Sequence, residues 1–543
     1  EINSGSAKSF DIAFTDCTAP EKGAMWFNSK WDNKKGENTV VEVNGEIVWQ
    51  VVKVAKIGDV EYTTLEAAFA AATEGQTITL LADVTLAGGY EDATEGLRIE
   101  KEITLNGNGY TINCGNFQKG IRIYNPSNVS DFNVNFNNVT VVNNVANGRC
   151  IDTRSGNINL KVNSSTLIAT NGNSQPLTIG GNDPVHRVTL NETTIDAGAS
   201  GYAVISFVST NVDIQGVNNS TISGFAAFYL KGDAKTTNLN LGQGVYTGTN
   251  NHAIESGVFG TVVLEGDNNV VNLMGTNATV KAIANNTAPQ AAFLVRGANN
   301  TIKITKESAK IITEGNAYEA MVKADNAATT KFVDMGIERK LVAENEDYQF
   351  YSFEEAVRFA GNEGTIKVVN DFELAEAWTV AAGQNITLDL NGKTISQTKA
   401  QTAGYQMILN DGELTIDDSS EAKTGKISYT DSGNGGEYIS DVIYNRATLV
   451  INGGTIENLS SATVAQNGYP HAVDTYSGII TDSEPINGGT IHCAKYSAIR
   501  MFGVSPTYTA DLVINGGNVK GAIDMQNGTK VAALGSLSIT GGK

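Results

Sequence analysis

Five side chains of types that bind sugars or other polar ligands lie close together near the C-terminal end of the sequence. They are His471, Asp474, Tyr476, Tyr496 and Arg500. An aromatic ring offers an apolar face and a charged group offers hydrogen bonds, which suits a sugar ring with its apolar face and edge of hydroxyls. We therefore consider these residues a candidate ligand-binding surface. The alternative is that they pack against one another between neighbouring structural repeats.

A second group of charged residues lies in the first third of the chain. Arg98, Arg122 and Asp152 each follow an apolar residue at regular spacing, and Arg154 lies close to Asp152. If these segments stack, the side chains become neighbours. Three interpretations remain: a structural row of ion pairs, a carbohydrate-binding patch, or a catalytic group. We expect a single carboxylate among these basic residues, which is too few to hold Ca²⁺.

The one Asp pair is Asp417-Asp418, within the turn-like stretch TIDDSSEAKTG. A glycosidase needs two carboxylates about 5 to 10 Å apart across the bond that it cleaves. Adjacent residues on a loop do not provide that separation. We expect this pair to be solvated or to cap a turn.

Histidine and cysteine give little support for a metal or redox site. The four histidines do not pair at metal-ligand spacing, and the four cysteines form no CxxC pair; they are His186, His252, His471 and His492, and Cys17, Cys114, Cys150 and Cys493. The cysteines are expected to be buried thiols, with a disulfide as the alternative. We predict no catalytic residue, no metal ligand and no cofactor, with Ca²⁺ left possible.

The charge balance narrows the class of partner. The net charge is −20 and the pI is near 4.7, which argues against binding nucleic acid or an anionic membrane through a basic face. An acidic surface is compatible with Ca²⁺, whose ligands are carboxylate and carbonyl oxygens. No apolar run is long enough to span a bilayer, so we predict no transmembrane segment.

Short strands and Asn-Gly turns must position the candidate residues. The stretch 103–112 reads ITLNGNGYTI, and 386–395 reads ITLDLNGKTI. Apolar and polar residues alternate in both, which predicts strands with one buried face. Asn and Gly supply the backbone conformation of a sharp turn. Asparagines at repeated turn positions are expected to stack into an amide ladder that satisfies buried backbone groups; they are Asn106, Asn391, Asn452, Asn487 and Asn515.

An apolar residue recurs mostly every 24 to 30 positions, and we call these residues anchors. Within residues 56–343 they are Leu97, Ile121, Ile151, Leu177, Val204, Phe228, Ile254, Phe293 and Met321. In the second half they are Ile408, Ile443, Val473, Ile499 and Ile523. A step of about 25 residues with three short strands is one turn of a parallel β-helix. Stacked turns bury their inward residues against each other.

A longer repeat divides the chain. The stretch beginning LEAAF at Leu65 returns 288 positions later as FEEAV at Phe353. Each copy predicts a short helix, over 64–74 and 352–361, that covers the open end of a stack of strands. We therefore expect three segments: 1–55, the tail of a preceding β-unit or a small β-domain; 56–343, a first β-helix unit; and 344–543, a second β-helix unit that lacks a recognisable cap at its C-terminal end.

The opening YTTLEAAFAAATEGQTITLLADVTL, together with ITLDLNGKTIS, LTIDDSSEAKTGKI and the repeated INGGTI, resembles secreted right-handed parallel β-helix proteins of the pectate-lyase-like superfamily. It is similar in particular to the repetitive surface proteins of gut and anaerobic bacteria. The resemblance covers residues 56 to 543. It implies an all-β fold of right-handed parallel β-helix solenoids in tandem and a secreted or cell-surface location. The fold hosts enzymes as well as adhesins and scaffolds, so it does not identify the function.

The catalytic motifs of polygalacturonase-like members are missing here, since the sequence has no Asn-Thr-Asp, His-Gly or Arg-Ile-Lys. We therefore expect a non-catalytic extracellular protein, an elongated stalk, adhesin or lattice component, that binds a glycan or a surface protein or associates with itself end to end or laterally. One alternative is a polysaccharide-degrading lyase or glycoside hydrolase. A phage tailspike-like protein is another.

Overall fold

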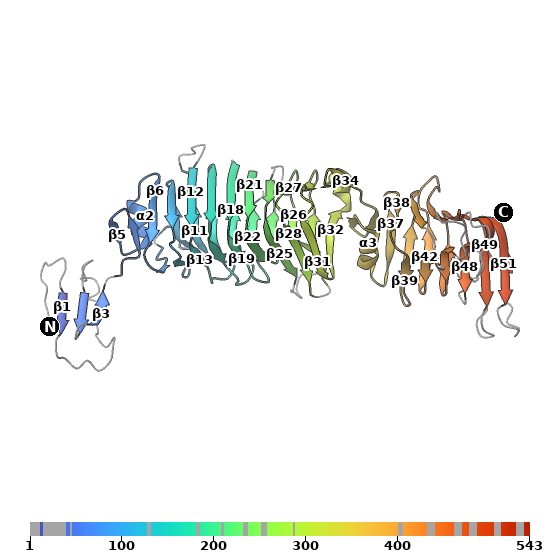
Figure 1. The fold of residues 1–543 in the computed structure, drawn as a ribbon, viewed down its shortest axis with the longest axis horizontal. Helices are drawn as coiled ribbons and strands as arrows, with labels where there is room; N and C mark the ends of the chain where they lie inside the picture. Colours follow the sequence, from blue (N-terminus) through green and yellow to red (C-terminus); the bar gives the residue numbers. More distant parts are fainter. Residues whose placement is uncertain are drawn as a thin grey trace. The chain divides into compact units, whose positions relative to one another are not determined.

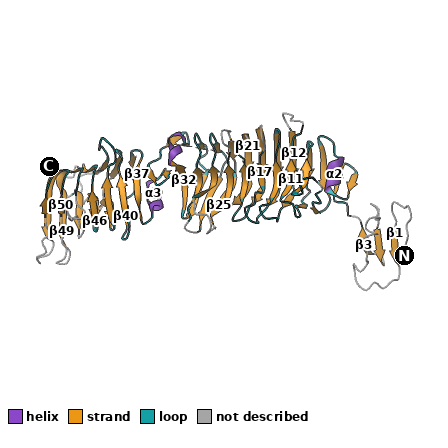
Figure 2. Ribbon diagram, turned by 180° about the vertical axis from the view of Figure 1, so that it is seen from behind, coloured by secondary structure: helices purple, strands orange, loops and turns teal. Residues whose placement is uncertain are grey.

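The structure is a computed structural model. It describes residues 11–14, 40–43, 46–50, 52–88, 90–126, 132–180, 185–207, 211–231, 237–250, 258–285, 288–399, 405–431, 440–460, 470–476, 486–503, 512–527 and 537–543. The chain divides into two compact units: unit 1 contains Glu1–Glu319 and Val333–Ile337, and unit 2 contains Ala320–Phe332 and Glu338–Lys543. Nearly every described element is a strand (Figure 2), and the strands form about 14 turns of parallel β-solenoid. The predicted all-β, parallel β-helix fold is therefore confirmed.

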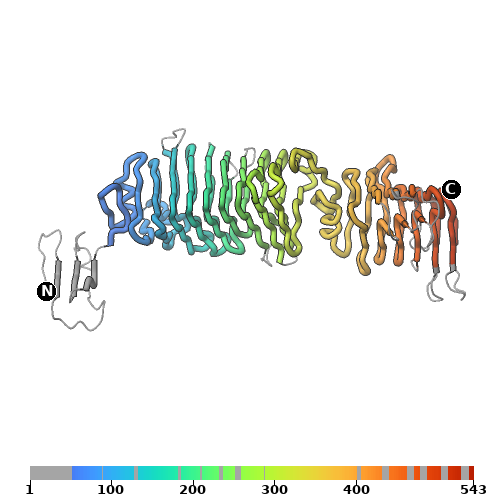
Figure 3. The backbone as a smooth tube through the Cα atoms, viewed as in Figure 1, coloured from blue at the N-terminus to red at the C-terminus, as the bar shows by residue number. Residues whose placement is uncertain are grey.

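Unit 1 begins with a three-stranded sheet of β1 (Asp11–Phe14), β2 (Val40–Val43) and β3 (Glu46–Gln50). After the antiparallel pair β4 (Ala55–Ile57) and β5 (Val60–Tyr62), the backbone winds through successive turns (Figure 3). Strands at the same place in each turn pair with those of the next turn, so each turn contributes one strand to each of three sheets. This is the stacking that a solenoid uses to complete its backbone hydrogen bonds.

One sheet of unit 1 carries the anchors, and we call it the anchor sheet. It consists of β8 (Glu95–Ile99), β11 (Lys119–Ile123), β14 (Arg149–Thr153), β17 (Leu177–Ile179), β20 (Tyr202–Ser206), β23 (Ala226–Leu230), β26 (Phe259–Leu264) and β29 (Gln290–Val295). The second contains β6 (Gln76–Leu80), β9 (Ile103–Asn106), β12 (Phe132–Asn137), β15 (Ile158–Asn163), β18 (Val185–Asn191), β21 (Asn211–Asn218), β24 (Thr237–Leu241), β27 (Val270–Leu273) and β30 (Thr301–Ile304). The third contains β7 (Val84–Thr85), β10 (Thr111–Asn113), β13 (Thr140–Val142), β16 (Thr166–Ile168), β19 (Thr194–Asp196), β22 (Ser220–Gly224), β25 (Gly244–Asn250), β28 (Ala278–Ala284) and β31 (Lys310–Gly315).

The anchors of unit 1 are buried and in register, with one correction. Leu97 pairs with Ile121, and the pairing continues turn by turn to Phe228. Phe228 then pairs with Val262, which in turn pairs with Phe293. Val262 therefore occupies the anchor position that we had assigned to Ile254, a residue outside the described ranges. Choosing Ile254 produced the one irregular step of 39 residues in the predicted series.

Unit 2 repeats the design (Figure 1). Its anchor sheet contains β39 (Trp378–Val380), β42 (Tyr405–Asn410), β45 (Ser440–Asn445), β48 (His471–Tyr476), β49 (Thr490–Gly503) and β51 (Asn518–Asn527). A second face is formed by β37 (Glu363–Val368), β40 (Asn385–Asp389), β43 (Glu413–Asp417) and β46 (Thr448–Ile451), and a third by β38 (Phe372–Glu373), β41 (Thr394–Lys399), β44 (Lys426–Asp431) and β47 (Thr455–Asn458). The long strands β49 and β51 join the third face to the anchor sheet, and β50 (Leu512–Ile514) pairs with β52 (Leu537–Ile539).

All five predicted anchors of unit 2 pair in order, from Ile408 to Ile523. The row begins one turn earlier than we predicted, because Trp378 pairs with Ile408. The anchors Phe293 and Ile499 are both fully buried, as expected of inward residues. The predicted anchor Ile254 lies outside the described part of the chain.

Each predicted helix is present and slightly shorter than expected. Helix α2 (Leu65–Ala71) is capped by Thr64, whose hydroxyl accepts from the backbone N–H of Ala67 at 3.2 Å. Helix α3 (Phe353–Ala360) is capped in the same way by Ser352. Helix α2 packs on β4 and β5, and α3 packs on β35 (Ala343–Asn345), β36 (Tyr348–Phe350) and β37. Neither helix has the length and apolar character needed to cross a membrane, and the described residues contain no other that has.

The stretch 341–348, which contains the predicted boundary between residues 343 and 344, forms part of a β-hairpin. Strands β35 and β36 are antiparallel, and Ala343 and Asn345 are buried. The other short elements nearby are η1 (Ala324–Thr329), β32 (Ala317–Lys323), β33 (Lys331–Asp334) and β34 (Ile337–Arg339).

The expected asparagine ladder is present, but not where backbone groups are buried. Asn487 donates to Asn452 at 2.9 Å and Asn515 donates to Asn487 at 3.4 Å, and both bonds are exposed. A buried ladder, which we did not predict, lies on the anchor sheet of unit 2, where Asn410 donates to Asn445 at 2.8 Å. The other two expected members bond elsewhere: Asn106 accepts from the backbone of Asn108, and Asn391 donates to the carbonyl of Val368.

Candidate functional site

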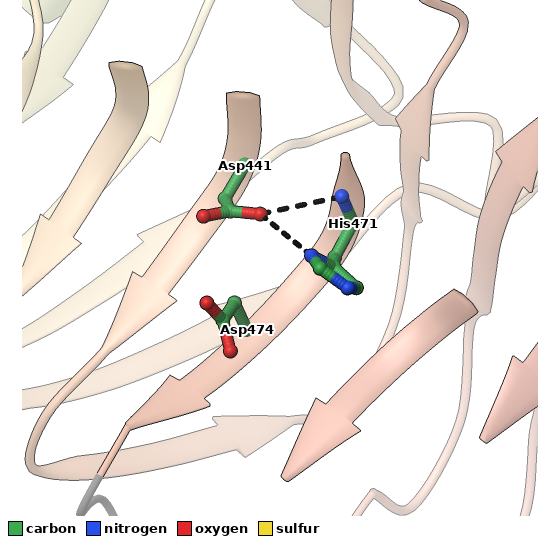
Figure 4. A group of neighbouring side chains, drawn as sticks. All are labelled: Asp441, His471 and Asp474. Carbon is green, nitrogen blue, oxygen red and sulfur yellow. Dashed lines mark hydrogen bonds and ion pairs between the residues drawn. The ribbon is translucent and has the colours of Figure 1, made fainter. Parts of the chain in front are cut away.

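A largely buried cluster on the anchor sheet of unit 2 contains three of the five predicted residues, His471, Asp474 and Arg500, together with Asp441. Asp441 on β45 pairs directly with His471 on β48, the same strand of the next turn. The carboxylate of Asp441 accepts from the backbone N–H of His471 at 3.2 Å, and its Oδ1 lies 3.0 Å from His471 Nδ1. Figure 4 shows this carboxylate facing the imidazole, with Asp474 beside the pair. Asp441, His471 and Asp474 are each at most 1% exposed.

Asp474 is held by Arg500 from the following turn. The two residues occupy matching positions on β48 and β49, as predicted. Arg500 Nε lies 2.8 Å from Asp474 Oδ1, and its Nη2 donates to Oδ2, so the pair is bidentate. The pair does not lie on an open binding surface, as we had considered for these residues: the side chain of Asp474 is fully buried and only 15% of the Arg500 side chain is exposed. A bidentate pair in such surroundings is far more sensitive to loss of one partner than a surface pair.

Burial determines the protonation of this cluster. Desolvation raises the pKa of Asp441 to about 8, against a smaller opposing effect of Arg500. Desolvation also lowers the pKa of His471 to about 4. Near neutral pH, Asp441 therefore holds a proton and the imidazole is uncharged. The pKa of Asp474 is raised to about 6, first by desolvation and then by Asp441, while Arg500 opposes the shift.

The aromatic residues of this region stack along the solenoid. The rings of Tyr444 and Tyr476 have centroids 6.0 Å apart at an interplanar angle of 28°. Tyr476 and Phe502 are 5.2 Å apart at 11°. Because Tyr476 has a ring against each face, its faces are covered and only its edge and hydroxyl remain for a ligand. Sugars stack on open aromatic faces, so this row fits packing between turns better than sugar binding.

The fifth predicted residue, Tyr496, lies on β49 three positions before the anchor Ile499. It is half-buried, and its backbone N–H lies 3.4 Å from the Sγ of Cys493.

The predicted charged row of unit 1 is also real, and it is larger than we expected. Arg98, Arg122 and Asp152 pair at matching positions of β8, β11 and β14. Two buried carboxylates, not one, lie at its centre, because Glu95 joins Asp152. Arg98 donates to Glu95 through both Nε, at 2.9 Å, and Nη2, at 2.6 Å, and Arg122 and Tyr124 donate to it from the next turn.

Asp152 is surrounded by guanidinium groups. Arg154 donates to its Oδ2 at 2.8 Å, Arg149 at 3.2 Å, and Arg122 Nε lies 3.4 Å away. A further pair joins Lys119 to Asp92 at 2.6 Å, where hydrogen bonds from Lys119 and Thr94 hold the pKa of Asp92 far below its usual value. The arginine planes also lie over the rings of Tyr90, Tyr124 and Phe207. The contacts of Arg122 with Glu95 and Asp152, of Lys119 with Asp92 and of Arg98 with Tyr124 connect consecutive turns, whereas the remaining ion pairs of Glu95 and Asp152 lie within one turn.

Sequence reasoning missed several members of these clusters: Asp92, Glu95, Lys119, Arg149 and Asp441. Four of them share one signal that could have revealed them. Glu95, Lys119, Arg149 and Asp441 all lie two residues before an anchor, and so does His471. We had followed only the position one residue after each anchor.

Three other predictions concern isolated groups. Asp418 caps a turn, as one of the two alternatives stated, because its carboxylate accepts from the backbone N–H groups of Gly392, Ser420 and Gly425. It is buried, so the solvated alternative is wrong for this residue. The described cysteines, Cys114, Cys150 and Cys493, are free and buried. Cys17 and His252 lie outside the described residues.

The buried ionisable groups described here are poorly placed for catalysis. A general acid or base must come within hydrogen-bonding distance of its substrate. The ionisable groups at the centres of both clusters are at most 1% exposed and are already engaged with neighbouring side chains; they are Asp441, His471, Asp474, Glu95 and Asp152.

None of the known protein family models matches the sequence, and neither a curated protein nor a solved structure shows significant similarity to it.

Proposed function

We propose that this chain is a non-catalytic structural protein of the extracellular space or the cell surface, a component of a stalk, an adhesin or a lattice. The observation that carries the proposal is that charged and aromatic side chains on both anchor sheets contact the next turn of the solenoid. Glu95–Arg122, Asp152–Arg122 and Asp474–Arg500 are pairs between turns. Tyr444, Tyr476 and Phe502 form a stack between turns. Such contacts stiffen a repeat scaffold.

The main rival is a polysaccharide-degrading enzyme. It is favoured by one feature, the buried carboxyl of Asp441 whose pKa is raised to about 8, since a glycosidase needs an acid that stays protonated near neutral pH. Its second carboxylate would have to be Asp474, which is bound on both oxygens by Arg500. A carboxylate paired in this way is a poor nucleophile or base. The geometry therefore supports the structural role better.

A degradation assay on the full chain separates these functions. We expect no release of reducing ends or unsaturated products from polygalacturonate, alginate, xylan or mucin glycans. Cleavage that disappears in Asp474→Asn or Asp441→Asn, with the fold intact by circular dichroism, would establish the enzyme instead. Fractionation of the source cells tests the location, and recovery solely from the cytosol would contradict the proposal.

A second function, retention of an anionic glycan, is favoured by the layering of the unit 1 cluster. The two central carboxylates, Glu95 and Asp152, are at most 1% exposed, whereas the side chains of Arg98, Arg149 and Arg154 are 20 to 29% exposed. Solvent therefore meets guanidinium edges with the acids beneath them. This arrangement presents positive charge locally on a chain whose net charge is −20, and guanidinium groups bind carboxylates and sulfates well.

Retention on immobilised heparin and polygalacturonate tests this second function. The double variant Arg98→Gln/Arg154→Gln should elute at lower salt than the parent. Each lost guanidinium removes part of the electrostatic attraction to the anionic glycan that salt has to screen. Lys281→Gln/Arg446→Gln is the matched control, since it removes the same charge from two ion pairs elsewhere, with Glu314 and Asp411. Equal elution of the parent and both variants would exclude a specific site at this cluster.

A further inference from the structure

We propose that Asp441, His471 and Asp474 form a binding site for a divalent transition metal ion such as Zn²⁺, held between two consecutive turns of unit 2. This site is separate from the structural role proposed above and does not depend on it. Asp441 comes from β45, and His471 and Asp474 come from β48. A metal ion there would join two turns through side chains that already face each other (Figure 4).

The geometry is the first support. Each residue offers one ligand atom, and the three atoms lie within 4.8 Å of one another. Ligand atoms around a tetrahedral Zn²⁺ are about 3.3 Å apart, given bonds of about 2.0 Å. The side chains therefore need to close by about 1.5 Å at most. Since one pair, Asp441 Oδ1 and His471 Nδ1, is already 3.0 Å apart, most of the adjustment falls on Asp474.

An unsatisfied atom is the second, independent support. Asp441 Oδ2 has no hydrogen-bond partner, and the residue is buried, with only 1% of its surface exposed. A buried carboxylate oxygen without a partner costs free energy, and such groups in native structures call for an explanation such as an ion. A cation that the carboxylate holds through both oxygens, Oδ1 facing His471 and Oδ2 without a partner, would supply the missing interaction. The oxygen belongs to the residue that the geometry independently selects as a ligand.

The ligand set indicates the class of metal. One imidazole nitrogen and two carboxylate oxygens suit Zn²⁺ and neighbouring first-row ions, whereas Ca²⁺ and Mg²⁺ prefer sites made of oxygen alone. Three protein ligands leave a position for water. Arg500 would act from behind Asp474, orienting its carboxylate through the bidentate pair, as outer-shell partners of metal sites do.

Charge balance is compatible with one divalent ion. Asp474 is already paired with Arg500. With both carboxyl groups ionised as ligands, any proton on them having left to solvent, the site would hold two carboxylates, one guanidinium and one divalent cation, a net charge of +1. Other charged or titratable groups near the cluster are Tyr444 on β45, Cys493 on β49 and Asp524 on β51. The carboxylate of Asp524 would partly offset the excess positive charge.

Titration calorimetry of the full, chelator-treated chain with ZnCl₂ tests the site. We expect one Zn²⁺ per chain at this site, no comparable binding of CaCl₂, and a rise in melting temperature of about 5 °C at a hundredfold excess over Kd. Asp441→Asn and His471→Asn should weaken binding by more than about a hundredfold, beyond the usual effect of an outer-shell substitution. The controls Asp411→Asn and His492→Asn remove the same groups elsewhere in unit 2 and should bind as the parent does.

Absorption spectroscopy at the zinc edge keeps the test decisive if the variants fold poorly. The Zn²⁺-loaded parent should show one imidazole and otherwise oxygen ligands. Sulfur ligands or two or more imidazoles would place the metal elsewhere and overturn the proposal. So would a lack of Zn²⁺ binding by the parent, a preference for Ca²⁺, or binding that Asp441→Asn leaves unchanged.

Discussion

At the scale of single residues, the ionisable groups on the anchor sheets are buried and neutralise one another. A protonated Asp441 faces an uncharged His471, Asp474 pairs with Arg500, and Glu95 is held by several donors. Desolvation raises the pKa of Asp441, while for Glu95 the hydrogen bonds outweigh desolvation and the pKa falls. Burial alone therefore does not fix the charge of a carboxyl here. The donors and positive charges that reach the carboxyl decide it, Arg98 from the same strand and Arg122 and Tyr124 from the next turn in the case of Glu95.

The shifted pKa of Asp441 predicts a pH dependence of stability. Between about pH 4 and 6.5, Asp441 and His471 offset each other, because the pair holds one proton both in the folded state, on Asp441, and in the unfolded state, on His471. Above pH 6.5 the unfolded chain loses that proton, whereas folded Asp441 keeps it up to about pH 8. Stability should therefore fall as pH rises from 6.5 to 8, by at most about 1.4 kcal/mol per pH unit.

Denaturant unfolding of the chelator-treated, metal-free chain at several pH values measures this effect, since a metal ion bound at this cluster would displace the proton of Asp441. Asp441→Asn should remove the fall between pH 6.5 and 8, since an amide does not titrate in this range. Asp411→Asn, which alters an exposed pair with Arg446, should leave it in place. A parent protein whose stability is constant or rises over that interval would contradict the assigned protonation.

The residue-scale site could be predicted only in part. That Asp474 and Arg500 are neighbours could be predicted, because both directly follow an anchor and adjacent turns place matching positions side by side. Their burial did not follow, since it depends on which side chains of the neighbouring turns cover them. One of these is Asp441, which lies two residues before an anchor, a position that we had not followed. The position of a side chain in the repeat can be read from the residues next to it in the sequence, whereas its burial depends on residues from other turns.

At the scale of elements, the two asparagine ladders of unit 2 differ in their contribution to stability. Asn410 and Asn445 are fully buried, and Asn410 also donates to the carbonyl of Thr448. The ladder from Asn452 to Asn487 is exposed. Removing a buried amide leaves its partners without hydrogen bonds, whereas water replaces an exposed one.

Alanine substitution of the two ladders tests this difference. Asn410→Ala should lower the free energy of unfolding by about 2 kcal/mol or more, and Asn487→Ala by less than about 1 kcal/mol. Chemical denaturation followed by circular dichroism provides both values. Equal losses would show that burial does not decide the contribution of the amide ladder.

The anchors make the hydrophobic contribution at this scale. Ile499 is fully buried between the turns that contain Val473 and Ile523. Ile499→Asp would place an unpaired carboxylate in the core and should cost more than about 4 kcal/mol. Met525, two positions after Ile523 on the neighbouring strand β51, is 37% exposed, so Met525→Asp should be tolerated. Thermal melts that are alike for the two variants would show that the assigned register is wrong.

The elements themselves were largely predictable. Thr64 and Ser352 cap the two helices as expected because N-capping depends on one residue and its near neighbours. The anchor series failed only near Ile254, where a longer turn separates Phe228 from Val262. Insertions between strands leave the solenoid intact, so spacing alone cannot locate the next anchor. A local apolar residue in the expected interval was therefore mistaken for it.

At the scale of the whole molecule, both units follow one plan. Each has a helix near its start, anchors that lie in one sheet and are buried except for the half-buried Ile523, and charged and aromatic residues beside those anchors. The sheets run parallel from turn to turn. The far-ultraviolet circular dichroism spectrum should therefore be dominated by strand, with a helical content close to the 5% of residues that are helical in the structure. A helical content above about a quarter of the chain would exclude the solenoid.

The central claim is that polar groups beside the anchors hold consecutive turns together. The most direct test is a double-mutant cycle on Asp474 and Arg500, measured as free energy of unfolding. Asp474→Asn and Arg500→Met should each cost about 3 to 5 kcal/mol, because each leaves the other charge buried without its partner. The double variant should cost clearly less than the sum, which reveals the coupling between the two residues. Single variants as stable as the parent, or losses that simply add, would contradict the structural role.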